Sequence, residues 1–511
     1  MCKGIKKMNV EYIVVQAGGK GTRMKQLTYN KPKALVPINN LPMIFHLFRQ
    51  FPNQKFIIIG DYKYDVMERY LKAFAQVDYK LIDARGKQGT CAGIREAIKI
   101  IPKNKSFMLI WSDLILPQNY EFPQAEKNYV GISKGFTCRW KFESGRFKEE
   151  RSRENGVAGH FIFKSKSEIS SVPEDGEFVR WLSVSNIVFD KQNLVDTNEY
   201  GLIEDLSNLE ISKCRPFNRM IFEKDRVIKE PIDQQGKDLA VREIAWYEKI
   251  KNEGYRNIPI IYSTTPLILE RIRGKNIYEI DCSYEEKYNI LKELIECLSE
   301  IHKMEQCDAD RNSYYDAYIG KTFARLEKVY DLVPFAHDKY IVINNTKCLN
   351  VFFCKEELEQ EVMKFMPQKF ELIHGDCTFS NMMLREDGSP VMIDPRGYFG
   401  KTELLGDPAY DWVKLYYSIV GNYDQFNLKR FTLKIEKDHV DLEIESNHWE
   451  DMEADFFKLL EGKVTQYQMK LLHAIIYLSL TTYAWQDYDS ICGAFYKGLL
   501  LLNEAIEERK N

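Results

Sequence analysis

The chain has 511 residues, of which 44% are hydrophobic and 29% are charged, which is the composition of a globular protein. Its length exceeds what one hydrophobic core usually organises, so two or three domains are expected. The net charge of −3, with no long run of lysine and arginine, argues against nucleic acid as a partner.

Cysteine usage and the apolar runs predict a cytoplasmic protein. The 11 cysteines are scattered without a Cys-x-x-Cys pair, which favours free thiols in a reducing compartment. The first apolar run, Val10 to Ala17, is too short for a signal peptide. The run nearest to transmembrane length, Leu471 to Leu480, is interrupted by His473, so no membrane insertion is expected.

A glycine-rich turn follows the first predicted strand. Residues 12–15 are apolar and lead into the sequence Gln-Ala-Gly-Gly-Lys-Gly-Thr-Arg-Met at 16–24. Glycines there allow backbone N–H groups to approach phosphate oxygens closely. The turn is not a Rossmann fingerprint, because Met24 stands where the third glycine belongs, and no Gly-Lys-Ser/Thr closes a Walker A loop.

The turn and the following segment Lys31-Pro-Lys-Ala-Leu-Val-Pro37 resemble the sugar-1-phosphate nucleotidyltransferase family. The resemblance implies a Rossmann-like mixed α/β domain. It also implies that a nucleoside triphosphate is cradled by Gly18, Gly19, Gly21, Thr22 and Arg23. Lys33 would contact the phosphate of the second substrate, and Arg23 and Lys33 together would offset developing charge.

The rest of this third continues the α/β pattern. Strands are expected at 56–60, 108–113 and 155–163, and helices at 66–74 and 94–101. The segment Gln88-Gly-Thr-Cys-Ala-Gly93 resembles the family's G-T-A-G segment, so Gln88 and Gly89 are expected to lie against the nucleotide.

Two carboxylates are candidates for binding Mg²⁺. Asp113 ends a strand, and the resemblance places the family's metal-binding aspartate there, although Ser112 replaces the usual preceding glycine. Asp205 falls where the second carboxylate of an Asp-x-Gly pattern would lie, but Ser207 replaces the glycine. A plain acidic turn is an equally good reading of Asp205.

From about residue 212 the pattern changes, which predicts a boundary between a domain of residues 1–212 and one of 213–511. Short strands at 219–222 and 226–231 flank a turn, and a helix is expected at 239–251. Lys229 on the second strand and Glu243 on the helix are placed to pair, so that the lysine can hold nucleotide phosphates.

The strand at 266–274 resembles a kinase hinge and brings Glu270 to the nucleotide. It would end a small lobe of about residues 213–274, followed by a large lobe of about 275–511. Helices are expected at 284–304, 317–330 and 356–366, and the aromatic-rich end of the chain from 449 to 506 is helical in pattern.

The most informative stretch is Leu372 to Gly400. Asp376 is placed to accept the proton of a substrate hydroxyl, and Asn381 and Asp394 are hard-oxygen ligands suited to Mg²⁺. Each fragment alone is typical of a plain turn. The ordered set, with a hairpin signal at 386–388 between its parts, favours a pair of kinase loops.

The pattern His374-Gly-Asp-x-x-x-x-Asn381, followed by an apolar strand and Asp394, resembles the aminoglycoside phosphotransferase and choline kinase family. The resemblance implies a bilobal, protein-kinase-like domain that binds ATP. Asp394 is followed by Pro-Arg-Gly rather than Phe-Gly, which indicates a small-molecule substrate rather than a protein. Asp411, in a Gly-Asp-Pro-x-x-Asp turn, is expected to brace the catalytic loop.

These features predict a bifunctional enzyme. The second domain would phosphorylate a hydroxyl with ATP, and the first would transfer a nucleotidyl group, with CTP the favoured donor, to the resulting phosphate. The product would be a nucleotide-linked sugar or polyol for a surface polysaccharide. Homo-oligomerisation is left open by the sequence.

Three alternatives remain. Choline or ethanolamine could be the substrate, although the tryptophan that choline kinases place after the metal aspartate is missing. One degenerate half would make the chain a binding or regulatory protein. Aminoglycoside phosphorylation would fit the second domain alone and leave the first 210 residues unexplained.

Overall fold

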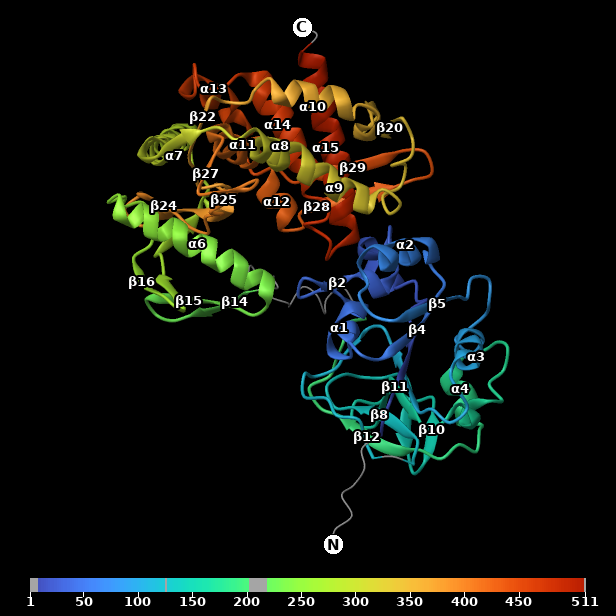
Figure 1. Cartoon of the computed structure of the whole chain (residues 1–511). Helices are drawn as coiled ribbons and strands as arrows, with labels where there is room; N and C mark the ends of the chain where they lie inside the picture. The colour runs from blue at the N-terminus through green and yellow to red at the C-terminus, as the bar shows by residue number, and fades with distance from the viewer. Residues whose placement is uncertain (1–7, 125, 202–217, 510–511) are drawn as a thin grey trace. The chain divides into compact units, whose positions relative to one another are not determined.

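The computed structural model of the chain describes residues 8–124, 126–201 and 218–509. It divides into two compact units, Met1–Ile211 with Gln486–Tyr488 and Ser212–Trp485 with Asp489–Asn511 (Figure 1). The predicted boundary at residues 212 and 213 lies outside the described residues. In the part of the chain that is described, no helix is long and apolar enough to cross a membrane.

The first unit is built on a mixed, nine-stranded sheet, drawn from blue to green in Figure 1. Its central strands are parallel, in the order β6, β1, β4, β5, and β11 joins β6 antiparallel. Their bounds are β1 Tyr12–Gln16, β4 Lys55–Gly60, β5 Tyr79–Asp83, β6 Phe107–Trp111 and β11 Gly156–Phe163. The remaining strands of this sheet are β8 Tyr129–Ser133, β9 Lys141–Glu143, β10 Arg146–Lys148 and β12 Asp190–Leu194.

Strands β1, β4 and β6 are almost wholly apolar because both faces of the sheet are covered there, whereas β5, at the edge of the sheet, carries Lys80 and Asp83. Val14, Ile57 and Leu109 are fully buried in the core that α3 helps to form. The helices of this unit are α1 Met43–Gln50, α2 Tyr64–Phe74, α3 Cys91–Ile100 and α4 Phe178–Ser183. The predicted strands and helices of the first third are therefore confirmed, with ends that differ by a few residues. The short strands β7 Leu114–Ile115 and β13 Asn198–Glu199 pair beside the sheet.

The small lobe of the second unit is an antiparallel sheet in the order β14, β15, β17, β16. The bounds are β14 Asn218–Phe222, β15 Arg226–Pro231, β16 Ile261–Thr264 and β17 Leu267–Glu270. The predicted turn is confirmed, because the N–H of Glu223 donates to the carbonyl of Arg226 at 2.9 Å. Helix α6, Gln234–Asn252, packs on β15 and extends beyond both predicted ends.

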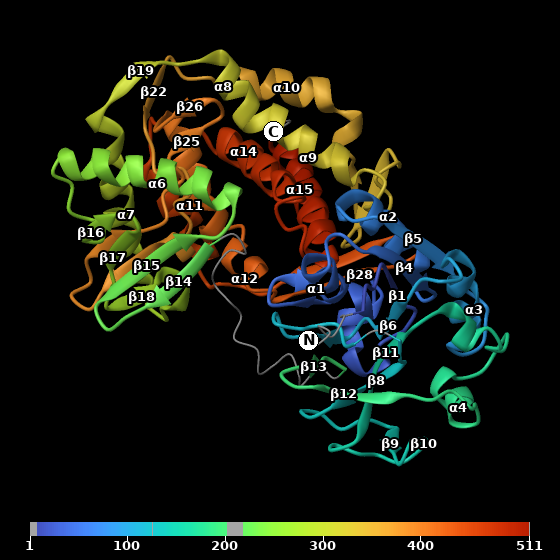
Figure 2. The ribbon, with the colours of Figure 1, turned by 60° about the horizontal axis from the view of Figure 1, so that its bottom comes forward.

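The large lobe is mainly helical. The predicted helix at 284–304 has those bounds in α7, where Ser283 and Glu286 form a capping box. The other main helices are α8 Arg311–Tyr315, α9 Lys321–Val329, α10 Lys355–Met363, α11 Pro408–Ile419, α12 Tyr423–Asn427, α13 Glu453–Leu459, α14 Gln466–Ser479 and α15 Tyr488–Glu508. Figure 2 shows α14 and α15 side by side, as Figure 1 does.

Short strands carry the loops of this lobe. Strand β22, Lys369–Leu372, leads into His374, and the hairpin of β23, Met382–Arg385, with β24, Pro390–Met392, leads into Asp394. That hairpin confirms the signal at 386–388. A further sheet was not predicted; it consists of β20 Tyr340–Ile343, β21 Thr346–Leu349, β28 Phe431–Ile435 and β29 Val440–Ile444.

Candidate active sites

The glycine turn and Asp113 of the first unit meet at one edge of the sheet. Strands β1 and β6 are parallel neighbours, with Gln16 opposite Trp111. The N–H of Ser112 donates to the carbonyl of Gln16 at 3.2 Å, which fixes the start of both loops. Ligands of open α/β sheets bind outside the carboxyl ends of the strands, so this edge is the candidate nucleotide site.

Each glycine of the turn has its own steric setting. Gly21 has a φ of +62°, and a Cβ there would lie 3.1 Å from the Cβ of Lys33. A Cβ on Gly18 would lie 2.9 Å from the Cβ of Asp61, whereas a Cβ on Gly19 would meet nothing within 4 Å. The turn is thus packed tightly against neighbouring residues at Gly18 and Gly21. The space beside Gly19 is open, so a phosphate could approach the backbone there. Thr22 begins the 3-10 segment Thr22–Thr28 that carries Arg23.

Charged groups from four segments converge beside this turn. Lys33, which is buried, forms a short ion pair with Asp113. A Cβ placed on Gly201 would lie 3.8 Å from Nζ of Lys33 and 3.5 Å from a guanidinium nitrogen of Arg23. The same point lies 3.5 Å from Oε1 of Glu199, on β13.

Glu199 is a residue that the sequence reasoning missed. The sequence signal for Glu199 is the acid-x-Gly pattern of Glu199-Tyr200-Gly201. The second metal-binding carboxylate was instead predicted at Asp205. The N–H of Tyr200 donates to the carbonyl of Asp113 at 3.0 Å, so Glu199 lies beside Asp113. Asp205 itself lies outside the described residues. Asp113 and Glu199 are both carboxylates, the donor type that Mg²⁺ prefers.

The segment of Gln88 and Gly89 is fixed by the loop at Gly176. The carbonyl of Gln88 accepts the N–H of Gly176 at 3.1 Å. Gly89 has a φ of +78°, and a Cβ there would lie 2.2 Å from the carbonyl oxygen of Gly176. Only glycine fits at this position, and the side chain of Gln88 is left exposed.

In the second unit, Lys229 joins the small lobe to the catalytic loops. Its Nζ donates to Oε2 of Glu243 at 2.7 Å and forms a short ion pair with Asp394. Glu243 is buried on α6, and Lys229 is nearly so. Burial alone would lower the pKa of Lys229, but the carboxylates of Asp394 and Glu243 raise it above its usual range. Lys229 is therefore a fixed cation.

Asp376 is held by two partners. The side-chain amide of Asn381 donates to its carbonyl at 2.8 Å and to its Oδ2 at 3.0 Å. Lys414, in the middle of α11, contacts its Oδ1 at 2.9 Å. Lys414 was also missed, because the Gly-Asp-Pro-x-x-Asp motif ends at Asp411 and does not include it, and only the packing of α11 brings it to the loop. The expected proximity of Asp376 and Asn381 is observed.

Asp411 braces the catalytic loop, as predicted. Its Oδ1 accepts the N–H of Gly375 at 2.7 Å, and its Oδ2 accepts the N–H of His374 at 2.9 Å and contacts Nε2 of His302 at 3.0 Å. Asp411 is fully buried, which alone would raise its pKa, but His302 and the loop N–H groups hold the pKa below its usual value.

The chemistry of Asn381 and Asp394 fits a magnesium ion. Since Nδ2 of Asn381 is spent on Asp376, its Oδ1 is the atom available to a cation. Asp394 lies two residues after the end of β24 and has a φ of +57°, which is a strained conformation for an aspartate. Over the described ranges no group of three or more histidine, cysteine or acidic residues could hold a metal. Two protein ligands suit Mg²⁺, which keeps waters and substrate phosphates in its shell.

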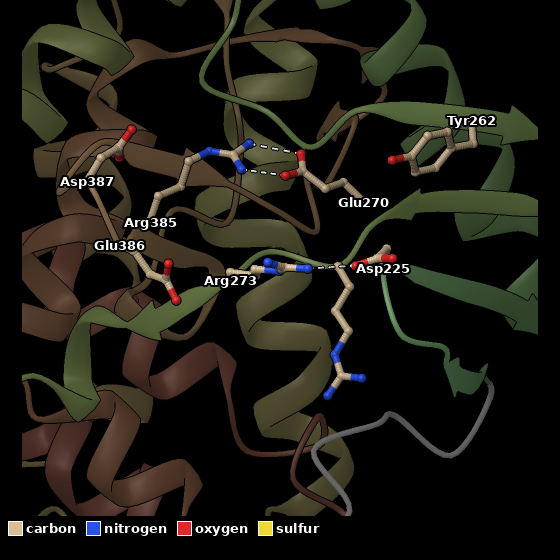
Figure 3. A pocket seen from close by; sticks show the side chains of 8 residues that line it. Asp225, Tyr262, Glu270, Arg273, Arg385, Glu386 and Asp387 are labelled. Atoms are coloured by element: carbon tan, nitrogen blue, oxygen red, sulfur yellow. Dashed lines mark hydrogen bonds and ion pairs between the residues drawn. The ribbon is translucent and has the colours of Figure 1, made fainter.

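Glu270 lies apart from this centre. Its carboxylate pairs with Arg385, one contact being 2.9 Å, inside a pocket of about 420 Å³ that Figure 3 shows. Its backbone N–H donates to the carbonyl of Ile260 at 2.8 Å. The pocket is lined by side chains of both charges and Tyr262, and includes neither Lys229 nor Asp394. The Glu270 side chain and N–H are thus both engaged within the protein.

The two sites define two transferase domains, one with a glycine-rich turn at a sheet edge and one with a lysine–glutamate–aspartate set beside the loop of Asp376 and Asn381. Residues 12–138 match the nucleotidyl transferase family, and residues 240–431 match the phosphotransferase enzyme family. The chain is therefore a fusion of a domain from each of these families.

Relatives of the first unit are partial matches. A D-glycero-alpha-D-manno-heptose 1-phosphate guanylyltransferase of Campylobacter jejuni is 31% identical over 100 residues, 19% of this chain and 45% of the relative. A UTP–glucose-1-phosphate uridylyltransferase of Haloferax volcanii is 29% identical over 110 residues, 21% and 44% of the two chains. The chain thus spans less than half the length of these curated relatives.

Solved structures similar to the first unit include two nucleotidyltransferases. The inositol-1-phosphate CTP transferase from T. maritima has 16% identity and a TM-score of 0.34, covering 40% of this chain and 94% of its own. The CTP:phosphocholine cytidylyltransferase from Streptococcus pneumoniae has 17% identity and a TM-score of 0.32, covering 38% of this chain and 96% of its own.

Proposed function

We propose that the chain is a bifunctional transferase that phosphorylates a small hydroxylated metabolite and then activates the phosphate with a nucleotide. The observation that carries the proposal is the contact of Lys229 with both Glu243 and Asp394, on a loop whose Ile393 N–H donates to the carbonyl of Asn381 at 2.9 Å. This set is what phosphoryl transfer from ATP needs. The converging Arg23, Lys33 and Asp113 in the same chain supply a second, separate site for phosphate chemistry.

In the first reaction the acceptor hydroxyl attacks the γ-phosphorus of ATP. The bond from the γ-phosphorus to the β–γ bridging oxygen breaks, ADP leaves, and Asp376 accepts the hydroxyl proton. Lys229 would hold the α and β phosphates. Asn381 and Asp394 would hold Mg²⁺, which supplies charge neutralisation on the phosphates.

In the second reaction an oxygen of the phosphomonoester attacks the α-phosphorus of a nucleoside triphosphate, and pyrophosphate leaves. The glycine turn would hold the triphosphate through backbone N–H groups, and Arg23 and Lys33 would offset the charge that develops. Asp113 would hold Mg²⁺, with Glu199 the nearby carboxylate and Asp205 the alternative. Neither a covalent intermediate nor a side-chain nucleophile is required.

The two reactions form a sequence, because the kinase product is the class of substrate that the transferase consumes. The curated relatives act, by their names, on sugar 1-phosphates, which supports a sugar or polyol as the metabolite. We keep CTP as the first donor to test, and a nucleotide-linked precursor of a surface polysaccharide as the product class.

The test separates the two sites in the full chain. Asp376→Ala should abolish ATP-dependent phosphorylation and leave pyrophosphate release from a supplied sugar phosphate unchanged. Asp113→Ala should do the reverse. Asp308→Ala is the matched control, since Asp308 is an exposed aspartate of the second unit paired only with Lys369 among the contacts of the described chain.

Phosphorylation would be followed with ATP, Mg²⁺ and a panel of sugars, polyols and amino alcohols. Each phosphorylated product would then be offered CTP, UTP, GTP and dTTP, with pyrophosphate as the readout. If either variant silenced both reactions while remaining folded, the model of two independent sites would be wrong. If the wild type showed neither reaction with any substrate, the proposed function would fail.

A further inference from the structure

Four cationic side chains gather near Tyr410; three of them contact its ring or hydroxyl, and Arg325 lies over the neighbouring ring of Tyr483. We name them the basic cluster: Lys321 and Arg325 from α9, Arg396 from the loop after Asp394, and Lys414 from α11. Each is half-buried, so each is enclosed by protein and still reaches solvent. None of the four was predicted as a site residue.

The contacts of the basic cluster are made through tyrosines. Arg396 donates to the hydroxyl of Tyr410 at 2.6 Å and to that of Tyr398 at 2.8 Å. The ammonium groups of Lys321 and Lys414 lie 5.8 Å and 6.0 Å from the centre of the Tyr410 ring. The cluster is therefore gathered at one place, and its contact with the catalytic loop is direct, because the N–H of Arg396 donates to the carbonyl of His374 at 2.9 Å.

The positive charge of the cluster is poorly compensated. Lys414 has Asp376 at 2.9 Å, and Arg325 donates to the carbonyl of Ser479 at 2.6 Å. Within the described ranges, Lys321, Arg325 and Arg396 form no ion pair, and Asp316 is the acidic group that acts on Lys321. Cations withdrawn from water in this way require an anionic partner.

The pKa of Lys321 reflects the excess of positive charge in the cluster. Burial, and then the charges of Arg396, Arg325 and Lys414, lower the pKa of Lys321 well below its usual value. Beside Lys414, Tyr417 is almost fully buried, and its hydroxyl has no hydrogen-bond partner among the described residues. A buried hydroxyl without a partner indicates a group still to be bound.

We propose that the basic cluster is the acceptor subsite of the phosphotransferase, and that it binds an anionic group carried by the acceptor. That group is a phosphate monoester or a carboxylate, which share the geometry and charge that arginine and lysine recognise. The acceptor is then an anionic sugar or polyol derivative. This inference rests on the proposed function and sharpens its substrate class.

The cluster disfavours choline and ethanolamine, because their cationic heads would face basic side chains, of which Arg325 and Arg396 form no ion pair among the described residues. The basic cluster is also made of other residues than the proposed ATP site, whose charged groups include Lys229 on β15 and Asp394. A cluster that served the phosphates of ATP would change the KM for ATP. A cluster that served the acceptor would change the KM for the acceptor alone.

The experiment compares matched acceptors with the full-length protein. Glucose, glucose 6-phosphate, glucuronate and choline would each be tested for ATP-dependent phosphorylation, and the two anionic members separate a phosphate from a carboxylate. The expected kcat/KM for one anionic member is about a hundredfold above that for glucose, as for charge-assisted hydrogen bonds. Equal use of glucose, or preference for choline, would overturn the inference and leave the kinase proposal standing.

Two variants test whether Lys321 and Arg396 bind the acceptor. Lys321→Met and Arg396→Gln should raise the KM for the anionic acceptor about tenfold or more, with the KM for ATP changed by less than about twofold. Lys369→Gln, a surface lysine paired with Asp308, is the matched control and should match the wild type. A rise in the KM for ATP instead would overturn the assignment.

A readout without catalysis separates this inference from the proposed function. Titration calorimetry with inorganic phosphate should show one more bound phosphate per chain in the wild type and in Asp376→Ala than in Lys321→Met, because any phosphate bound at the glycine turn of the first unit is common to all three proteins. Lys321→Met should also raise the melting temperature of the ligand-free protein, because it removes a repelled cation. Phosphate binding that depends on Lys321, without any phosphorylation, would refute the kinase and keep the anion site. Absence of phosphate binding, or unchanged binding in Lys321→Met, would refute the anion site.

Discussion

Replacing Asp411 by asparagine should both destabilise the second unit and stop its catalysis. The buried carboxylate accepts three contacts, from Gly375, His374 and His302. Asparagine keeps one acceptor oxygen and turns an NH₂ group towards a backbone N–H donor, so one buried N–H loses its partner.

The size of the effect follows from these contacts. An unpaired buried N–H costs about 1–3 kcal/mol, and each surviving bond loses about 1 kcal/mol when its acceptor is no longer charged. The expected loss is therefore about 3–5 kcal/mol in the free energy of unfolding. Because the loop also carries Asp376, the kcat of phosphoryl transfer should fall about a hundredfold, while nucleotidyl transfer is unchanged.

Urea denaturation followed by circular dichroism would measure the stability change in the transition of the second unit. Asp387→Asn, a change in the exposed turn between β23 and β24, is the control and should shift stability by less than about 0.5 kcal/mol. An Asp411→Asn protein with the wild-type urea midpoint and kcat would refute the bracing role.

The pH dependence of the free energy of unfolding tests the role of Asp411 independently. The pKa of Asp411 is lower in the folded protein than its usual value, so its contribution to stability is fully present above the unfolded pKa of about 4. That contribution is lost as the pH falls through the lower, folded pKa. The stability gap between wild type and Asp411→Asn should therefore narrow below about pH 4, and a gap that stays constant in acid would contradict the assignment.

Three other changes have defined outcomes. Glu243→Gln should lower kcat/KM for ATP in the phosphorylation assay about a hundredfold, or about 2.7 kcal/mol, because Lys229 loses a buried partner; a wild-type value would show that the pair is not needed. Glu199→Gln should raise the Mg²⁺ concentration for half-maximal nucleotidyl transfer about tenfold, whereas an effect of Asp205→Asn alone would make Asp205 the second carboxylate. Gly89→Ala, whose Cβ would lie 2.2 Å from the carbonyl of Gly176, should raise the KM for the nucleoside triphosphate and destabilise the first unit by about 1–3 kcal/mol, as seen by thermal denaturation.

Sequence periodicity and loop motifs predicted the parts of the fold that local physics determines. Helix α7 has its predicted ends because apolar spacing and the Ser283–Glu286 capping box act within the helix. The catalytic loop was found because Asp376 and Asn381 lie five residues apart and bond directly. The hairpin of β20 and β21 was missed although Asn344 and Asn345, with φ of 48° and 63°, form the type of turn that closes such hairpins.

Residues that long-range packing brings together escaped prediction. Lys414 lies 38 positions after Asp376 and outside the motif that ends at Asp411, and only the packing of α11 makes them partners. The basic cluster is assembled in the same way from α9, α11 and one loop. Glu199 is followed by Tyr200 and Gly201 in an acid-x-Gly pattern, but the second carboxylate was predicted six residues later, at Asp205.

The number and direction of the N–H bonds of Lys229 explain why lysine, and not arginine, suits this position. A lysine has three N–H bonds, and two of them point to Glu243 and Asp394, so one is left, which in the proposed function would meet a phosphate oxygen of the nucleotide. The three acceptors surround the nitrogen in three dimensions. A planar guanidinium spreads its five donors in one plane and extends further, so arginine could not serve the same three oxygens from β15, despite having the same charge.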